Sequence, residues 1–219
     1  MFVKDILLLK NVYISPYQSR EEAIKLMSSY HSWDIPVVNG KQFIGNLSEG
    51  DLLAADKDSL IESLCEDLPC YHLKTSDHLL FAYQFMLKSG VFLMPVINEN
   101  MEFVGTMSRL VLFDNFGKVF GFFDPGSLIV LRVKRTDFVL SEISRIIEGE
   151  NSTVISSLVS ADEDPTFLNI TVKLQTFEIR DIVTSLKRHD YNVLSFYNED
   201  NLQGFLEDRY DQLINYLNI

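Results

Sequence analysis

The chain has 219 residues, about one and a half times the usual length of a single domain, so it allows one large domain or two to three small ones. Its 19 Lys and Arg residues against 31 Asp and Glu residues leave a net charge of −12, which argues against nucleic acids and anionic membrane surfaces as partners but not against one small anionic ligand. Hydrophobic residues make up 47% of the chain, enough for packed cores, which argues against a disordered chain.

The first apolar segment, Ile6–Leu9, is too short for the core of a signal peptide. No apolar run in the chain approaches the roughly 18 residues that a membrane span requires. Cys65 and Cys70 lack the neighbouring ligands of a zinc site, and two free thiols fit a reducing compartment. We therefore expect a cytoplasmic protein that contacts neither membrane nor nucleic acid.

A helix, a hairpin and a second helix are predicted next. The capping-box sequence Ser19–Glu22 opens the first helix. Ile35–Val38 reads as a strand, and Asn39–Gly40 is a strong signal for a two-residue hairpin turn. Phe43–Leu47 is the returning strand, and a short helix follows over Glu49–Ala55.

The same order of elements is predicted a second time. A helix over Leu79–Lys88 is closed by Gly90 as its C-cap. Strands over Met94–Asn98 and Glu102–Met107 follow, with a four-residue turn between them, and a helix starts at Arg109–Phe113.

The two units form an internal repeat. With an offset of 59 residues, identical residues coincide in this order: Ala23 and Ala82, Met27 and Met86, Pro36 and Pro95, Val37 and Val96, Asn39 and Asn98. After one extra residue in the second turn the offset is 60, and further identical residues coincide: Phe43 and Phe103, Gly45 and Gly105, Ser48 and Ser108. Units of about sixty residues bury too little surface alone, so we expect the two to pack together.

This pattern resembles the CBS domain, and two such units in tandem resemble a Bateman module. The resemblance covers residues 1–121 and rests on Val3–Ile6, on Ala23 and Met27, on Ile35–Val38, and above all on Gly45–Leu53. The last segment matches the closing pattern of the family, in which a glycine is followed by Ser or Thr and then by Asp. Asn46 departs from that pattern, because the family usually has an apolar residue there.

The resemblance implies an adenine nucleotide in the cleft between the repeats. Carried over by position, Ser48 and Asp51 would hold the phosphate and the ribose. Ile14, Ile35 and Pro36 would frame the base. The spacing Ser48-x-x-Asp51 is equally an ordinary capping pattern at a helix start, and this structural alternative stays open.

A weaker second site is expected in the other repeat, formed by Met94, Pro95 and Ser108. Val111 stands where the first repeat has Asp51, and valine cannot accept a hydrogen bond from a ribose hydroxyl. Countercharge for a phosphate could come from a basic residue near a motif end: Lys41, Arg109 or Lys118. Because the protein is net acidic, we expect weak or magnesium-assisted nucleotide binding, with no cofactor required.

Catalytic motifs are not found. The four histidines, His31, His72, His78 and His189, have no spacing with carboxylates or cysteines that indicates a metal set. The acidic cluster Asp162–Asp164 lacks the ligand spacing of an EF-hand and is expected to be a solvated loop. We therefore expect no catalytic residues and no metal site.

Five phenylalanines crowd the segment before the turn Asp124–Gly126: Phe113, Phe116, Phe120, Phe122 and Phe123. A flexible linker would not carry so many aromatic residues. We expect them to be buried, either against the second repeat or in a subunit interface.

The rhythm changes after Gly126 to βαββαβ, which predicts helices packed on an antiparallel sheet in the ferredoxin-like manner. The expected elements are strand Ser127–Lys134, helix Asp137–Glu148, strand Thr153–Ser160, strand Phe167–Gln175, helix Glu178–Arg188 and strand Asn192–Tyr197. This topology, after a CBS pair, resembles an ACT-like domain. The Pro-Gly turn of amino-acid-binding ACT domains is missing from Arg135–Leu140, so a structural role, such as pairing of sheets side by side, is the preferred reading.

The predicted fold is therefore α+β, with two CBS-type repeats packed as a Bateman module and an ACT-like domain after them. The expected boundaries are residues 1–60 and 61–121 for the repeats, 127–198 for the ACT-like domain, and 199–219 for an amphipathic C-terminal helix that packs on that domain or on a second subunit.

The architecture resembles CBS–ACT proteins of the acetoin-utilisation type. It favours a homodimeric, non-enzymatic regulatory protein that binds AMP, ADP, ATP or S-adenosylmethionine and acts on an unknown partner protein. The alternative is a structural dimerisation or interaction module with a vestigial ligand site.

Overall fold

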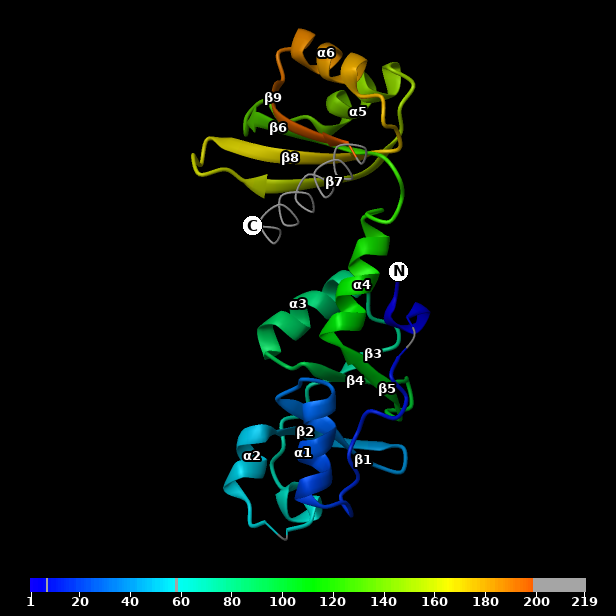
Figure 1. Ribbon diagram of the computed structural model, residues 1–219, viewed down its shortest axis with the longest axis vertical. Helices are drawn as coiled ribbons and strands as arrows, with labels where there is room; N and C mark the ends of the chain where they lie inside the picture. Colours follow the sequence, from blue (N-terminus) through cyan, green and yellow to red (C-terminus); the bar gives the residue numbers. More distant parts are fainter. Residues whose placement is uncertain (7, 58, 199–219) are drawn as a thin grey trace, which may run out of the picture. The chain divides into compact units, whose positions relative to one another are not determined.

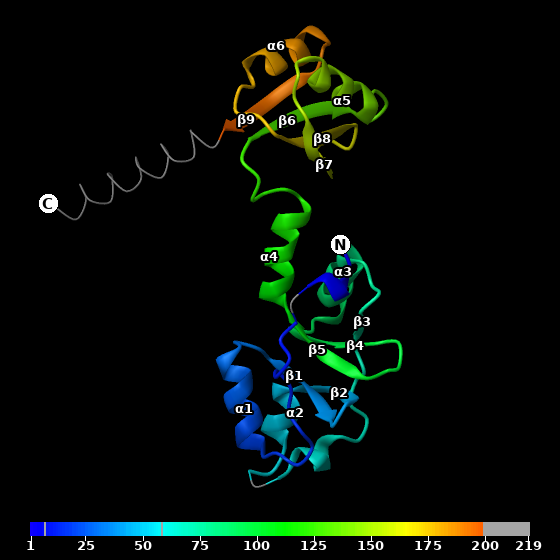
Figure 2. The same ribbon diagram turned by 90° about the vertical axis from the view of Figure 1, so that its right-hand side faces the viewer.

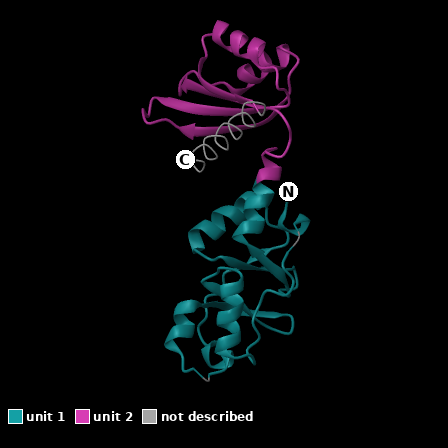
Figure 3. Ribbon diagram, viewed as in Figure 1, with its two compact units in different colours: residues 1–116 teal, residues 117–219 magenta. Residues whose placement is uncertain are grey.

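A computed structural model describes residues 1–6, 8–57 and 59–198, a mixed α/β chain (Figure 1). It divides into two compact units, residues 1–116 and 117–219 (Figure 3). The C-terminal helix predicted over residues 199–219 lies outside the described residues.

The first repeat has the predicted order of elements. Helix α1, Arg20–Ser29, begins with the expected capping box of Ser19 and Glu22. Strands β1, Asp34–Asn39, and β2, Gln42–Ser48, pair antiparallel, and helix α2, Glu49–Ala54, follows directly. The two residues between the strands are Gly40 and Lys41, one position later than predicted, because Asn39 still pairs with Gln42 across the hairpin.

The second repeat has the same order. Helix α3, Leu79–Ser89, ends at Gly90, whose left-handed φ of 78° fits the C-cap predicted there. Strands β4, Leu93–Ile97, and β5, Phe103–Ser108, pair antiparallel, and helix α4, Arg109–Val119, follows. The α4 helix is six residues longer than the start predicted at Arg109–Phe113, because Gly117 does not end it.

Short elements that the sequence did not suggest connect the repeats. Strand β3, Leu73–Lys74, adds parallel to β4, and in the first repeat Ile14 bridges Val37 of β1 in the same parallel manner. The 3₁₀ turns η1, Val3–Asp5, and η2, Ile61–Leu64, precede these bridging segments. Each sheet is therefore completed by the segment that enters its repeat.

The two repeats also exchange backbone contacts. Before Ile14 joins β1, Leu9 bridges Thr106 of β5 in the other repeat. In the mirror arrangement, Asn46 of β2 donates its N–H to the carbonyl of Pro69, 2.8 Å away, in the segment that leads into the second repeat. The segment that enters each repeat thus first contacts the sheet of the other repeat and then joins the sheet of its own. These crossed contacts hold the two repeats together as one packed unit.

The second unit is a four-stranded antiparallel sheet in the order β7-β8-β6-β9, with both helices over one face (Figure 2). Its elements in chain order are β6, Ser127–Lys134, α5, Leu140–Gly149, β7, Val154–Ala161, β8, Phe167–Leu174, α6, Arg180–Arg188, and β9, Asn192–Asn198. The core lies between helices and sheet and includes Leu131, Ile147, Ile170 and Leu186, all fully buried. The predicted βαββαβ order is observed, although α5 begins three residues later than predicted.

Candidate functional site

Ser48 and Asp51 form the capping box of α2. Asp51 Oδ2 accepts hydrogen bonds from the hydroxyl of Ser48 at 2.6 Å and from its backbone N–H at 2.9 Å, and the N–H of Asp51 donates to Ser48 Oγ at 3.2 Å. The single hydroxyl proton of Ser48 is therefore used within the protein. In the described part of the chain, Asp51 Oδ1 has no hydrogen-bond partner, and the side chain is exposed, so one carboxylate oxygen is left for a ligand.

The residues predicted to frame the base lie in the core of the first repeat. Ile14, Ile35 and Pro36 are buried. The N–H of Ile14 donates to the carbonyl of Pro36 at 2.9 Å, and the carbonyl of Ile14 accepts from Val38 at 2.9 Å. These backbone groups hold the sheet together, so a base could reach them only at the edges of the strands.

The cavity beside Asp51 is acidic. It has a volume of about 360 Å³ and is formed by α2, by η2 and by the segment that follows η2. Among the described residues, Asp51, Glu66 and Asp67 line it, and no basic side chain does. Three carboxylates oppose a phosphate, so this cavity suits an uncharged or magnesium-bound part of a ligand better than free phosphates.

In the second repeat, Met94 and Pro95 are buried, and Ser108 is half-buried at the start of α4. Ser108 Oγ accepts from the N–H of Val111 at 3.2 Å. No described residue accepts the Ser108 hydroxyl proton, because Val111 replaces the carboxylate that takes it in the first repeat. Valine at position 111 therefore removes the acceptor for a ribose hydroxyl, and it also leaves the Ser108 hydroxyl free to donate to a ligand.

Ser108 lines a second cavity of about 360 Å³, the junction cavity, where the end of α1 meets the starts of β4 and α4. Its lining is Ser29, Tyr30, His31, Phe92, Leu93, Ser108, Arg109 and Leu110. The basic side chains of this lining are Arg109 and His31, and no carboxylate of the described residues belongs to it. The junction cavity therefore has the charge pattern that a phosphate requires, which the Asp51 cavity lacks.

Arg109 is held in place at the mouth of β4. Its guanidinium donates to the carbonyls of Gly90 at 2.7 Å and Val91 at 3.3 Å, and it lies over the ring of Phe92, 3.8 Å from the ring centre. Two carbonyl contacts leave further N–H groups of the guanidinium for another acceptor. The other basic candidates differ: Lys41 is exposed and pairs with Glu102 at 3.3 Å, and Lys118 lies near the end of α4.

Asp34, which the sequence did not single out, joins the two repeats. At the start of β1, its carboxylate accepts the N–H of Phe92 at 2.7 Å and the N–H of Leu93 at 2.8 Å. Burial raises the pKa of Asp34, while these two hydrogen bonds and the positive charge of Arg109 lower it. The alignment of the two repeats could have revealed Asp34. The second repeat has the apolar Leu93 at the aligned position, so an acidic residue at the start of the buried strand is unusual.

Asn46, which departs from the family pattern, makes hydrogen bonds between the two repeats. Its Nδ2 donates to the carbonyls of Pro69 at 3.0 Å and Tyr71 at 2.8 Å. At the aligned position, Thr106 Oγ1 donates to the carbonyl of Val12 at 2.6 Å. Both residues fasten an entry segment to the neighbouring sheet, so Asn46 has a structural reason independent of any ligand.

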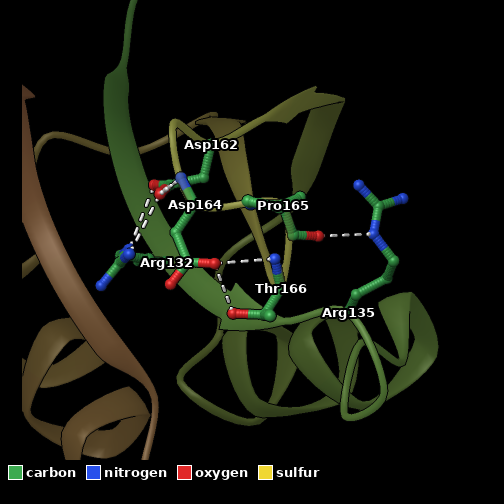
Figure 4. Close-up of polar contacts among 6 residues, drawn as sticks. All are labelled: Arg132, Arg135, Asp162, Asp164, Pro165 and Thr166. Carbon is green, nitrogen blue, oxygen red and sulfur yellow. Dashed lines mark hydrogen bonds and ion pairs between the residues drawn. The ribbon is translucent and has the colours of Figure 1, made fainter.

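The acidic cluster in the second unit lies in an exposed turn, as predicted, but Asp162 is fixed by an ion pair. Asp162 pairs through both carboxylate oxygens with Arg132, at 3.0 and 3.1 Å, and the Asp162 side chain is only 12% exposed (Figure 4). Arg132 also lies over the ring of Phe167, and Asp164 accepts from the N–H and hydroxyl of Thr166. The ion pair therefore attaches the turn between β7 and β8 to strand β6. The hydrogen bond from Arg132 also lowers the pKa of Asp162.

The phenylalanines near the end of α4 are not all buried within the chain. Phe113 is 74% exposed and Phe123 is 69% exposed, while Phe122 is about half exposed. The ring of Phe116 contacts that of Tyr83 of α3, with 4.5 Å between ring centres and the two planes tilted by 42°. Burial against the second repeat is therefore wrong for Phe113, because α4 presents this side chain away from the core.

The described residues offer neither a metal cluster nor a membrane-spanning helix. Within them, no group of three or more His, Cys, Asp or Glu side chains could hold a metal ion. None of the described helices is long and apolar enough to span a membrane.

The family model of the CBS domain matches residues 3–58. Among solved structures, a CBS domain pair/ACT domain protein from Thermotoga maritima is 22% identical with a TM-score of 0.48, and the match covers 54% of this chain and 98% of that one. CBSX2 in complex with AMP is 20% identical with a TM-score of 0.43, covering 54% and 97%. The cytosolic domain of the Mg²⁺ channel MgtE in complex with ATP is 19% identical with a TM-score of 0.39, covering 48% and 44%. The family match and the repeated order of elements agree with the expected tandem of CBS-type units.

Proposed function

We propose that the protein is a non-enzymatic regulatory protein that binds an adenine nucleotide between its two repeats, starting from the match of residues 3–58 to the family model of the CBS domain. The observation that carries the proposal is the junction cavity. There the unused hydroxyl proton of Ser108 lies in the same lining as Arg109 and His31. A neutral hydroxyl and basic side chains without a carboxylate are suited to a phosphate.

The rest of the junction cavity suits a base. Tyr30 and Phe92 offer aromatic rings, and Leu93 and Leu110 offer apolar surface. A volume of about 360 Å³ is at the lower end of the roughly 300–1,000 Å³ found for small-molecule sites. We therefore favour a nucleoside monophosphate, AMP, over ATP at this position.

The first repeat offers a different kind of site. The free Oδ1 of Asp51 could accept a ribose hydroxyl, as the CBS resemblance implies, but Glu66 and Asp67 beside it oppose free phosphates. Ligands that reduce this repulsion are a magnesium-bound nucleotide or the cationic S-adenosylmethionine. Nucleotide binding there should therefore strengthen when magnesium is added, whereas binding in the junction cavity should not require it.

Calorimetric titration with AMP, ADP, ATP and S-adenosylmethionine, with and without magnesium, tests the proposal. A hydrogen bond from Ser108 to a charged phosphate contributes about 1.5–3 kcal/mol, so Ser108→Ala should weaken AMP binding about 10- to 100-fold. Ser59→Ala is the matched control, since the Ser59 hydroxyl donates to Asp56 and lines neither cavity. Absence of binding by all four ligands, or equal AMP affinity in the Ser108→Ala protein, would contradict it.

A specific observation also supports an assembly role. Leu87 of α3 and Phe113 of α4 are 59% and 74% exposed, on two helices that contact each other through Tyr83 and Phe116. We propose that these helices form the surface of a homodimer and that nucleotide binding alters the surface offered to a regulated protein in the cytoplasm. The ACT-like reading of the second unit, with its observed βαββαβ order, is part of this proposal as a structural module.

A further inference from the structure

We propose that Asp34 is a positioning residue for the junction cavity: its carboxylate fixes the Phe92–Leu93 wall from the opposite repeat, so nucleotide affinity depends on it. The inference rests on the proposed function only for the identity of the ligand that binds in the cavity. The hydrogen bonds by which Asp34 holds the Phe92–Leu93 wall do not depend on any ligand.

The geometry shows how the wall is held. Phe92 and Leu93 both line the cavity, and both donate their backbone N–H groups to the one carboxylate of Asp34, at 2.7 and 2.8 Å. The carbonyl of Phe92 in turn accepts the N–H of Arg109 at 3.2 Å. The Asp34 side chain of the first repeat therefore sets the position of the Phe92–Leu93 backbone, and this backbone is hydrogen-bonded to Arg109 of the cavity.

The chemistry requires an ionised carboxylate. Each of the two N–H groups meets its own oxygen of the Asp34 carboxylate, whereas an amide has one oxygen and carries the donor Nδ2 in place of the other. Hydrogen bonds to a charged acceptor are also about twice as strong as neutral ones. An asparagine in the same side-chain position would turn its Nδ2 toward one of the two N–H groups, so that wall residue would lose its acceptor or share the one remaining oxygen in poorer geometry.

The repeat explains why this arrangement serves one cavity only. In the alignment of the repeats, Trp33 and Asp34 coincide with Phe92 and Leu93. The two aromatic rings meet edge to face, 6.3 Å apart, across the junction. Asp34 accepts the N–H groups of Phe92 and Leu93, but a leucine side chain accepts no hydrogen bond, so Leu93 has no equivalent role toward the first repeat. The symmetry is therefore broken by a single residue, on the side where Ser108 and Arg109 lie.

Three parts of the first unit supply the polar and charged neighbours of Asp34: the start of α4, the end of β2, and the segment before β1. Arg109 at the start of α4 acts on it with a favourable charge. Ser48, which pairs with Asp34 across β1 and β2, is neutral and is followed by Glu49 of α2. His31 lies three residues before Asp34 and lines the cavity itself. The Arg109 charge therefore acts on Asp34 from the same cavity whose wall Asp34 holds.

The test combines a structural and a binding measurement on the whole chain. In Asp34→Asn, the amides of Phe92 and Leu93 should exchange hydrogen about 10-fold faster or more, and AMP affinity should fall about 10-fold or more, while melting stays cooperative. Asp34→Glu should restore part of both. Asp77→Asn is the matched control, because Asp77 accepts one backbone N–H, that of Lys74, within the second repeat.

Each result is decisive. Unchanged exchange at Phe92 and Leu93 overturns the inference, and so does altered exchange with unchanged AMP affinity. If AMP binds to none of the proteins, the proposed function fails, and the exchange data alone decide whether Asp34 holds the wall. Should Asp34→Asn not fold, the native protein still gives the answer: the amide resonances of Phe92 and Leu93 must titrate together with the Asp34 carboxylate, and independent titration overturns the inference.

Discussion

At Asp34, burial and hydrogen bonding pull the pKa in opposite directions, and burial is the larger effect, so the pKa lies above the ordinary value of 3.8. A raised pKa means that the folded state binds the proton more tightly than the unfolded chain does. The contribution of Asp34 to the free energy of unfolding is therefore largest at low pH and declines as the pH rises from 3.8 through the raised pKa.

Comparison of the native protein with Asp34→Asn isolates this contribution. Asp162 and Asp164, whose pKa values are lowered, lose their contributions as the pH falls, but they are common to both proteins and cancel. Urea unfolding from about pH 3.5 to pH 7.5 should show the native protein losing stability relative to the variant as the pH rises, with a plateau above the raised pKa. A stability difference that does not change with pH, or a native protein that gains stability relative to the variant as the pH rises, would contradict the raised pKa of Asp34.

Local spacing explains which site residues the sequence could reveal. Ser48 and Asp51 lie three positions apart, so a helix start brings them together whatever the rest of the chain does. Asp34 meets Phe92 and Leu93, 58 and 59 positions away, only once both repeats have folded and packed. No pattern in the sequence specifies that contact, because it depends on the relative placement of two strands from different repeats.

At the scale of the elements, Gly45 is required by the crossing of two backbone segments. A Cβ at this position would overlap Leu68 of the segment that covers β2, with the backbone of Leu68 also within 3.4 Å. Neither β2 nor the covering segment can move without losing the bond from Asn46 to Pro69. Gly45→Ala should therefore lower the free energy of unfolding by about 1–3 kcal/mol, as overpacking does.

Gly50→Ala is the matched control of opposite sign. Gly50 lies within α2, where an added Cβ meets only Ser48 Oγ at an ordinary 3.5 Å. Alanine there should raise stability by about 0.5–1 kcal/mol through its helix propensity. Thermal unfolding of both variants measures the difference, and a stability of Gly45→Ala equal to that of the native protein would show that the covering segment is not packed as described.

Hydrophobic periodicity predicted the principal helices and the hairpin strands because each has its own apolar face. It missed β3, which has two residues, and the entry segments, because a strand that short has no period. It also ended α4 too early. Gly117 weakens a helix, but a single glycine costs only about 1 kcal/mol, which the contact of Tyr83 with Phe116 helps to offset.

At the scale of the whole molecule, the charge restricts where two copies could meet. Two chains of net charge −12 repel each other, so a stable contact needs a surface with few charges. Helix α3 has one charged residue in eleven, Lys88, and exposes Phe81 and Leu87. Helix α4, which contacts α3 through Phe116 and Tyr83, exposes Leu110 and Phe113. Apolar area that water would otherwise contact supplies the attraction, and salt reduces the repulsion.

Sedimentation equilibrium should therefore show a dimer whose association strengthens with salt. A glutamate at Leu87 or Phe113 would bury an unpaired charge in the contact, which costs at least about 2 kcal/mol and should weaken association about 30-fold or more. Tyr17→Glu controls for the added charge, because Tyr17 is 64% exposed and lies outside both helices. A monomer at all salt concentrations, or equal weakening by all three substitutions, would contradict the α3–α4 interface; AMP binding by such a monomer would leave the junction cavity as an independent property of one chain.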